Sequence, residues 1–206
     1  MVSSKPVYSF EEADSKNRML LGGKGAGLSE MTRLKLPVPA GFTITTEVCN
    51  KYYDNNKKLP KDVMPAVMKN IAKMEKKTGK KWNSIKNPLL VSVRSGAATS
   101  MPGMMDTILN LGLNEQTVEG FAEQTKNPRF SWDSYRRFIQ LFGKVVFGVN
   151  DEKFDHVLDA VKEKQGITDD SKLNVESLKT IVLEYKKICE KHTKRKFPDT
   201  PDEQLV

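Results

Sequence analysis

From Asn114 onward, apolar side chains recur at intervals of three and four residues, which is the spacing of one helix face. Three such stripes follow one another, with polar residues between them. They are formed by Tyr135, Phe138, Ile139, Phe142, Val145 and Val146, then by Phe154, Val157, Leu158 and Val161, and then by Val175, Leu178, Val182, Tyr185 and Cys189. This period suits helices and does not suit strands, so it predicts an all-helical part from about Leu113.

Polar residues at the start of these segments are typical helix caps. Asn114 can cap the first helix, and Asn127–Pro128 opens the next, because proline is tolerated in a first turn. The tail from Phe197 to Val206 holds two prolines and shows no periodicity.

The sequence before Leu113 mixes strands with helices. Short strands are expected at Tyr8–Phe10, Phe42–Thr45, Leu89–Val93 and Ile108–Leu111, the third of them buried. Helices are expected from Thr45 or Thr46 towards Asp54, and from about Lys61 to Lys77 with Gly79 ending the second. We therefore predict an α/β part over residues 1–112, a helical part over 113–197 and a tail over 198–206.

A glycine-rich segment, Gly22–Gly27, stands between the apolar Met19–Leu21 and a helical stripe formed by Leu28, Met31 and Leu34. The local pattern predicts strand, glycine loop and helix. Glycines let backbone N–H groups point at an anion, and Lys24 can neutralise phosphate. The segment matches neither a P-loop nor the dinucleotide fingerprint. A plain turn and a phosphate loop both stay open as interpretations.

Arg94 follows the predicted strand Leu89–Val93 and precedes Ser95–Gly96. A guanidinium at a strand end can reach a ligand in an α/β cleft, and its planar fork suits phosphate oxygens. The alternative is an arginine that pairs with a local carboxylate.

Two further segments carry candidate polar groups. In Met101–Thr107, proline and glycine shape a turn, and Asp106 either holds an arginine or a metal-bound water or has a capping role. In Ser134–Phe138, both Arg136 and Arg137 fall outside the apolar stripe, and a solvated helix face is the favoured interpretation.

The histidines and cysteines indicate no reactive centre. His156 and His192 are expected on the surface, and Cys49 and Cys189 are expected to be small apolar fillers. Two cysteines cannot supply a zinc site alone, and two histidines exclude a histidine-rich metal centre.

The formal net charge of +8 is unevenly placed along the 206 residues. Residues 1–110 hold 18 basic and 9 acidic residues, whereas residues 111–206 hold 16 and 17. An anionic partner is therefore expected at the front half, although most of its lysines should simply face solvent. Nucleic acid is not expected, because no reader motif accompanies the basic run. No apolar run reaches the roughly 20 residues of a membrane span, and no secretory signal opens the chain. A cytoplasmic location is expected, and organellar targeting of the parent protein stays open as the alternative.

Taken together, these segments resemble the N-terminal end of the pyruvate, phosphate dikinase family. The similarity is carried in order by Leu20–Leu28, Pro39–Glu47, Val91–Leu113, Asn127–Phe130 and Asp133–Ile139. Phosphoenolpyruvate synthases share the glycine-lysine loop and the Arg94–Ser95 pair, but Met101–Thr107 is closer to the dikinases.

The resemblance implies part of an ATP-grasp fold with an all-helical subdomain. It implies an enzyme that converts ATP, phosphate and pyruvate to AMP, pyrophosphate and phosphoenolpyruvate through a phosphohistidine on a separate domain of the full-length chain, which can be a homodimer. In the family, the carboxylates for magnesium and the phosphorylated histidine come from sequence beyond Val206. The chain is therefore expected to be a fragment that completes no turnover alone and binds ATP weakly.

The resemblance also assigns roles to particular positions. Lys24 and Arg94 would hold the ATP phosphates as the catalytic cations, and Arg137 would reach in from the helical part. Further binding positions would be Ser95 and Gly96, and Gly103, Met104, Asp106 and Thr107 in the loop over the phosphates. No metal ligand is expected within this chain.

Two alternatives of other classes stay open. One is a non-catalytic nucleotide- or anion-binding module, which the absence of an acid/base pair in the motifs favours for the isolated chain. The other is a structural or interaction domain without a ligand.

Overall fold

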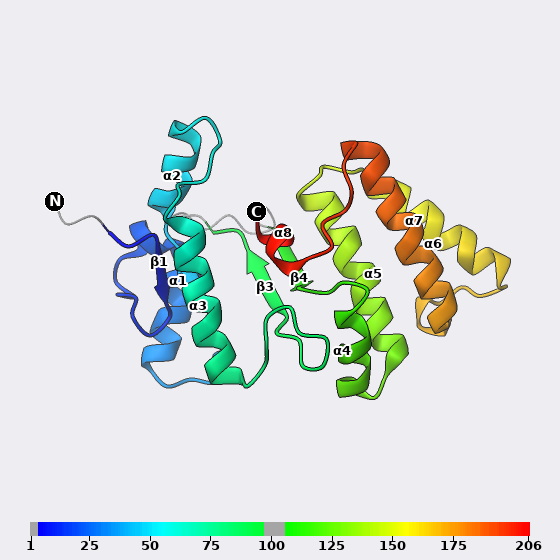
Figure 1. Ribbon diagram of the computed structural model, residues 1–206, viewed down its shortest axis with the longest axis horizontal. Helices are drawn as coiled ribbons and strands as arrows, with labels where there is room; N and C mark the ends of the chain where they lie inside the picture. The colour runs from blue at the N-terminus through cyan, green and yellow to red at the C-terminus, as the bar shows by residue number, and fades with distance from the viewer. Residues whose placement is uncertain (1–3, 97–105) are drawn as a thin grey trace. The chain divides into compact units, whose positions relative to one another are not determined.

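The computed structural model describes residues 4–96 and 106–206 (Figure 1). Their contacts form two compact units. Unit 1 contains the described residues up to Lys80 together with Ser95 and Gly96, and unit 2 contains Lys81–Arg94 and Asp106–Val206. No helix among the described residues has both the length and the apolar character needed to cross a membrane.

Unit 1 is built on a two-stranded antiparallel sheet in which β1 (Val7–Ser9) pairs with β2 (Phe42–Ile44). Three helices accompany the sheet, namely α1 (Arg18–Arg33), α2 (Thr46–Asp54) and α3 (Val63–Thr78). Helix α3 packs against β1, and α1 packs against α2 and β2. The apolar core is small and has no aromatic member among the described residues; it is formed by Val7, Leu21, Ala26, Val48, Val63, Val67 and Ile71.

Unit 2 combines a hairpin with a helical layer. Strand β3 (Val91–Arg94) pairs antiparallel with β4 (Thr107–Leu111), with a register shift between Val91 and Val93. The helices are α4 (Thr117–Thr125), α5 (Pro128–Val145), α6 (Glu152–Lys164), α7 (Val175–Thr193) and α8 (Pro201–Leu205), with a 3₁₀ turn, η1, at Asp170–Lys172. Helix α5 is central, because it packs against α4, α7 and β4.

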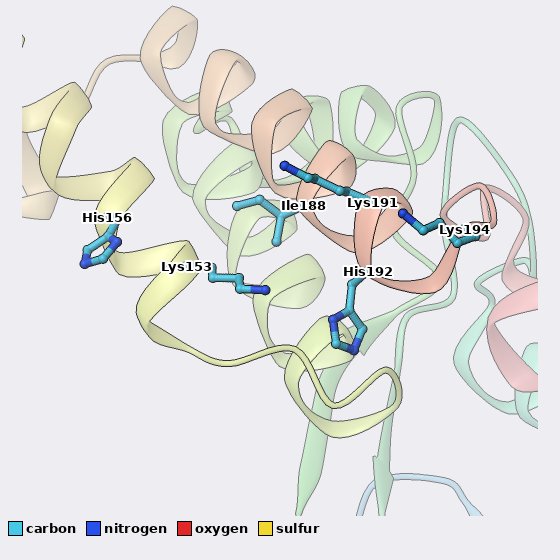
Figure 2. Close-up of a pocket in the computed structure, with 6 residues that line it drawn as sticks. All are labelled: Lys153, His156, Ile188, Lys191, His192 and Lys194. Carbon is cyan, nitrogen blue, oxygen red and sulfur yellow. The ribbon is translucent and has the colours of Figure 1, made fainter.

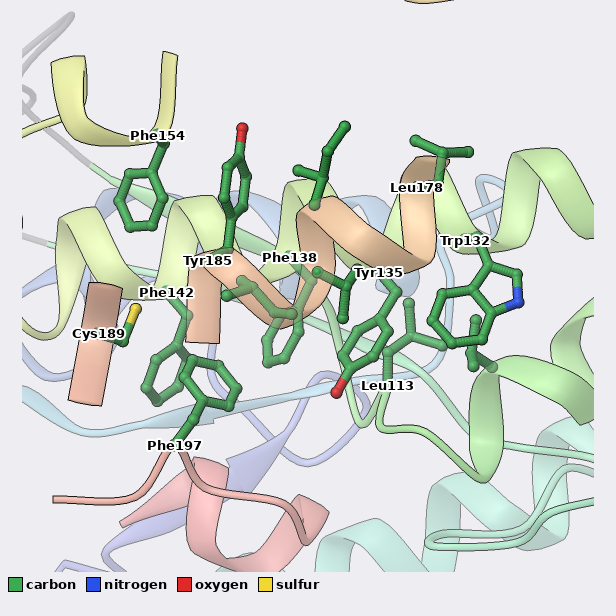
Figure 3. Packing of buried hydrophobic residues seen from close by; sticks show 14 of the residues in the cluster. Leu113, Trp132, Tyr135, Phe138, Phe142, Phe154, Leu178, Tyr185, Cys189 and Phe197 are labelled. Atoms are coloured by element: carbon green, nitrogen blue, oxygen red, sulfur yellow. The ribbon is translucent and has the colours of Figure 1, made fainter. Parts of the chain in front are cut away.

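The core of unit 2 is rich in aromatic rings (Figure 3). Phe138, Phe142 and Phe197 pack together, with ring centroids 5.4–6.2 Å apart, and Phe154 meets Tyr185 edge to face at 4.8 Å. Such pairs add to the stabilisation that comes from burying their area. This core holds α5, α6, α7 and the segment before α8 in one packed body.

Most of the predicted helices are confirmed. Asn127 caps α5 by accepting a hydrogen bond from the Phe130 N–H, and Gly79 ends α3 in the left-handed conformation. Asn114 accepts hydrogen bonds from the N–H groups of Gln116 and Thr117 at the start of α4. The coarse prediction of a mixed helix and sheet chain is therefore confirmed.

Several local predictions are wrong. The Met19–Leu21 segment is the first turn of α1 and not a strand. The strand predicted at Leu89–Val93 is β3, which begins only at Val91; Leu89 before it is buried, but Val93 is 40% accessible because β3 belongs to a two-stranded hairpin. The tail after Phe197, for which no element was predicted, contains α8, and a capping box formed by Thr200 and Glu203 caps the start of this helix.

Candidate functional site

Gly22 divides α1 into two helical segments. Its backbone has φ 69° and ψ 168°, a conformation that is essentially restricted to glycine, and the helix resumes directly after it. The predicted glycine loop is therefore a kink followed by a helix start, with Lys24 in the first turn of the second segment. Gly25 in that turn lies against β2, because a Cβ there would come within 2.7 Å of the Thr43 hydroxyl oxygen.

Lys24 reaches from this turn to the loop that follows β3. Its Nζ donates a hydrogen bond to the carbonyl oxygen of Ser95 at 3.1 Å, while the side chain stays exposed. A lysine ammonium has three N–H donors, so this bond leaves two for another acceptor. Ser95 directly follows Arg94 in the sequence. Lys24 therefore binds the carbonyl group of the residue that follows Arg94, the other cation predicted for the site.

The β3–β4 hairpin brings three further predicted residues to one end. Arg94 and Thr107 are paired across the ladder, and Asp106 directly precedes Thr107. Arg94, Ser95, Gly96 and Asp106 are all exposed. Gly103 and Met104, which we also predict to bind the nucleotide, lie outside the described residues.

Arg137 lies on α5 with 61% of its side chain exposed, as predicted. Its Nε donates to one carboxylate oxygen of Asp133 at 3.1 Å. The other oxygen of Asp133 accepts from Arg136 at 2.8 Å. Asp133 therefore orients the exposed Arg137 through one oxygen, while its other oxygen is bound to Arg136.

Arg136 is buried, so the predicted solvated face is wrong for this residue. Its guanidinium also lies 3.7 Å from the carboxylate of Asp170 and donates to Gln140. Burial, the largest single influence, would lower the pKa of Arg136, but its interactions with the Asp133 carboxylate and with Tyr185 together outweigh burial and raise the pKa. Asp133 stands three residues before Arg136 and four before Arg137, a spacing that indicates ion pairs on a helix and that the apolar stripe does not reveal.

The histidines and cysteines do not form a metal or reactive site among the described residues. Among the residues that the structure describes, no group of three or more His, Cys, Asp or Glu side chains is placed to hold a metal ion. His156 and His192 are exposed, as predicted, and line a hollow between α6 and α7 (Figure 2). Cys189 is a buried filler as predicted, whereas Cys49 is exposed and does not fill a core.

Comparison with known proteins gives a consistent result over most of the chain. Residues 18–58 and 55–190 match the family model described as the pyruvate phosphate dikinase AMP/ATP-binding domain. The chain is 52% identical over 199 residues to pyruvate, phosphate dikinase of Entamoeba histolytica, 48% over 204 residues to that of Clostridium symbiosum and 47% over 211 residues to that of Giardia intestinalis.

These matches cover nearly all of this chain and a small part of each relative. They include 97–99% of the chain but only 22–24% of the three relatives. The chain therefore spans about a quarter of the length of the curated proteins that it matches.

Proposed function

This chain belongs to the pyruvate, phosphate dikinase family, and we propose that it forms the ATP-binding part of such an enzyme, within an ATP-grasp fold. The match to an AMP/ATP-binding domain over residues 18–190 is the observation that carries the proposal. The full-length protein would convert ATP, phosphate and pyruvate to AMP, pyrophosphate and phosphoenolpyruvate. Its phosphohistidine domain, and a second copy in a homodimer, are the proposed partners.

In this proposal, Lys24 and Arg94 bind the phosphates of ATP. The kinked start of the second segment of α1 supports this role for Lys24, because helix N-termini favour negative charge. Both side chains are exposed, and the ammonium of Lys24 has donors left beyond its bond to Ser95. Phosphoryl transfer needs positioning and charge neutralisation more than a protein nucleophile, and these cations supply both.

The remaining residues would surround the same phosphates. Arg137 would add a third cation. Its Nε donates a hydrogen bond to Asp133, so the two terminal nitrogens of its guanidinium can face a ligand. Ser95 and Gly96 would bind the nucleotide, and Gly103, Met104, Asp106 and Thr107 would belong to the loop over the phosphates. Small residues and backbone N–H groups suit such a loop, because they allow a close approach to oxygen.

Magnesium is part of the expected chemistry, but the described residues do not fit a site for it. They contain no cluster of carboxylate, histidine or cysteine ligands. We therefore assign no step of the reaction to magnesium through this chain's described residues.

The proposal predicts that ATP binds to the chain and that two single substitutions weaken it. In calorimetric titration, Lys24→Ala and Arg94→Ala should each reduce ATP affinity by about tenfold or more, the loss expected for one charge-assisted contact. Lys69→Ala and Arg195→Ala are matched controls, because both side chains are exposed and outside the proposed site. If all four variants bind ATP alike, the roles of Lys24 and Arg94 are wrong.

A second experiment separates binding from turnover. The isolated chain is expected to release no AMP from ATP, with or without phosphate, because His156 and His192 do not stand in the family's histidine motif. Chromatographic separation of the nucleotides after incubation measures this directly. AMP formation that Arg94→Ala abolishes would show that the chain alone carries the catalytic step.

A further inference from the structure

A hollow of about 490 Å³ lies on the surface of unit 2, beside the C-terminal half of α7. It is lined by one apolar side chain, Ile188, and by five basic ones, Lys153, His156, Lys191, His192 and Lys194. Figure 2 shows Lys153 and His156 on α6, and the other lining residues on α7 and at its end. Of the residues that the structure describes, none with a carboxylate lines this basic hollow.

The lysines of the basic hollow have no anionic partner in the part of the chain that the structure describes. By contrast, the other lysines of α7 each pair with a carboxylate: Lys179 with Glu176, Lys186 with Glu115 and Asp199, and Lys187 with Glu184. Unit 2 is almost neutral as a whole, with 19 Lys and Arg against 18 Asp and Glu. The positive potential is therefore local to the hollow and is not a property of the whole surface.

Helix stability explains only part of this clustering. Lys191 and His192 lie in the last turn of α7, where a positive charge is favourable to the helix dipole. Lys153 lies in the first turn of α6, where a positive charge is unfavourable. A binding role accounts for both positions, because the packing of α6 on α7 brings the two sets of cations to the same hollow.

We propose that the basic hollow binds an extended acidic segment of another protein. Figure 2 shows the side-chain nitrogens spread along the hollow and not directed at one point, an arrangement that suits a row of carboxylates better than a single compact phosphate. The half-buried Ile188 offers an apolar contact to a side chain of that segment. The proposal does not depend on the nucleotide site, since the two share no residue.

The test uses the full 206-residue chain and a fluorescent ten-residue peptide of glutamates with a central leucine. Anisotropy at low salt should show binding, and Lys153→Glu combined with Lys191→Glu should weaken it by about tenfold or more, because like charges then face each other. Lys86→Glu combined with Lys172→Glu is the matched control, with the same change in net charge at exposed positions of unit 2 outside the hollow. Equal weakening by the two double variants would overturn the proposal.

A second measurement needs no substitution, so it holds even if a variant fails to fold. In NMR titration of the unchanged chain, the peptide should shift the backbone amides of Lys153 and of residues 188–194 most strongly. Inorganic pyrophosphate at the same concentration should shift them less. The proposal is wrong if the largest shifts lie elsewhere, or if pyrophosphate binds the hollow more tightly than the peptide.

Discussion

Arg136 is a charged side chain that unit 2 encloses almost completely, with 3% of it exposed. Its partner Asp133 accepts from this buried arginine through one oxygen and from the exposed Arg137 through the other. The stability of α5 in the core and the orientation of Arg137 therefore depend on one carboxylate. A change at Asp133 should affect both properties.

We predict that Asp133→Ala lowers the free energy of unfolding of unit 2 by about 3 kcal/mol, because it leaves the buried charge of Arg136 without its closest partner. Urea denaturation followed by tryptophan fluorescence measures this loss. Adding Arg136→Met should recover part of the loss, since the uncompensated charge is then removed.

Glu184→Ala is the control for this experiment. It removes an ion pair of the same i, i+3 type, but the side chains of Lys187 and Glu184 are 68% and 44% exposed. Such a pair contributes about 0.5 kcal/mol or less. A loss at Asp133 no larger than the loss at Glu184 would contradict the importance given to the buried pair.

The two cysteines should differ sharply in reactivity. Burial raises the pKa of the Cys189 thiol to about 12, so it stays protonated and unreactive in the folded chain even at pH 10. Cys49 is exposed. Titration with a chromogenic disulfide at pH 8 should therefore detect one thiol in the native chain and two in denaturant. Detection of two in the native chain would mean that unit 2 opens far more readily than its packing indicates.

For single residues, the sequence predicted burial correctly where it depends on the apolar face of one helix. It was wrong where burial depends on contacts with residues far away in the sequence. The stripe on the last long helix correctly predicted the burial of Cys189. The same reasoning put Arg136 in solvent, because it could not show that Asp170 of the η1 turn comes close to it. The exposure of Cys49 has the same origin, since it depends on what packs against α2.

The kink of α1 is the element on which the proposed phosphate site depends. Gly22 allows the chain to leave one helical segment and start another, and so places Lys24 in a first turn. The sequence identified this segment as glycine-rich and as a candidate anion site. It did not predict the helical turn before Gly22, because three apolar residues are too few to distinguish a strand from a helix.

We predict opposite effects for two glycine-to-alanine changes in this element. Gly22→Ala should lower the free energy of unfolding by about 1–3 kcal/mol, because alanine is strained at φ 69° and ψ 168°. Gly27→Ala should raise it by about 0.5–1 kcal/mol, because Gly27 is helical and a Cβ there meets nothing within 4 Å. Urea denaturation followed by far-UV circular dichroism compares the two. Equal effects would mean that Gly22 does not need its special backbone conformation.

The β3–β4 hairpin shows which features of the candidate site could be predicted from local sequence patterns. Both strands were predicted close to their true positions, but their pairing, which puts Arg94 opposite Thr107, was not predicted. The hydrogen bond from Lys24 to Ser95 joins positions far apart in the sequence, and no local spacing indicates such a contact. Only the family resemblance predicts that these residues belong to one site, and that remains a prediction.

Over the whole molecule, the apolar core is unevenly divided. The buried aromatic residues of the described chain all belong to unit 2, where α5 packs against α4, α7 and β4. Among its described residues, unit 1 has seven buried apolar ones, none of them aromatic. The aromatic residues of the predicted helical stripes all occur after Asn114, which agrees with this difference.

This difference predicts the order in which the units unfold. Burial of apolar area is the main favourable contribution to folding, so unit 1 should unfold at a lower urea concentration than unit 2. Both tryptophans, Trp82 and Trp132, belong to unit 2, so their fluorescence reports that unit alone, whereas far-UV circular dichroism reports the helices of both. The dichroism should therefore begin to fall before the fluorescence changes. Coincident transitions would show instead that the two units unfold as one cooperative body, and that the larger core stabilises the smaller one.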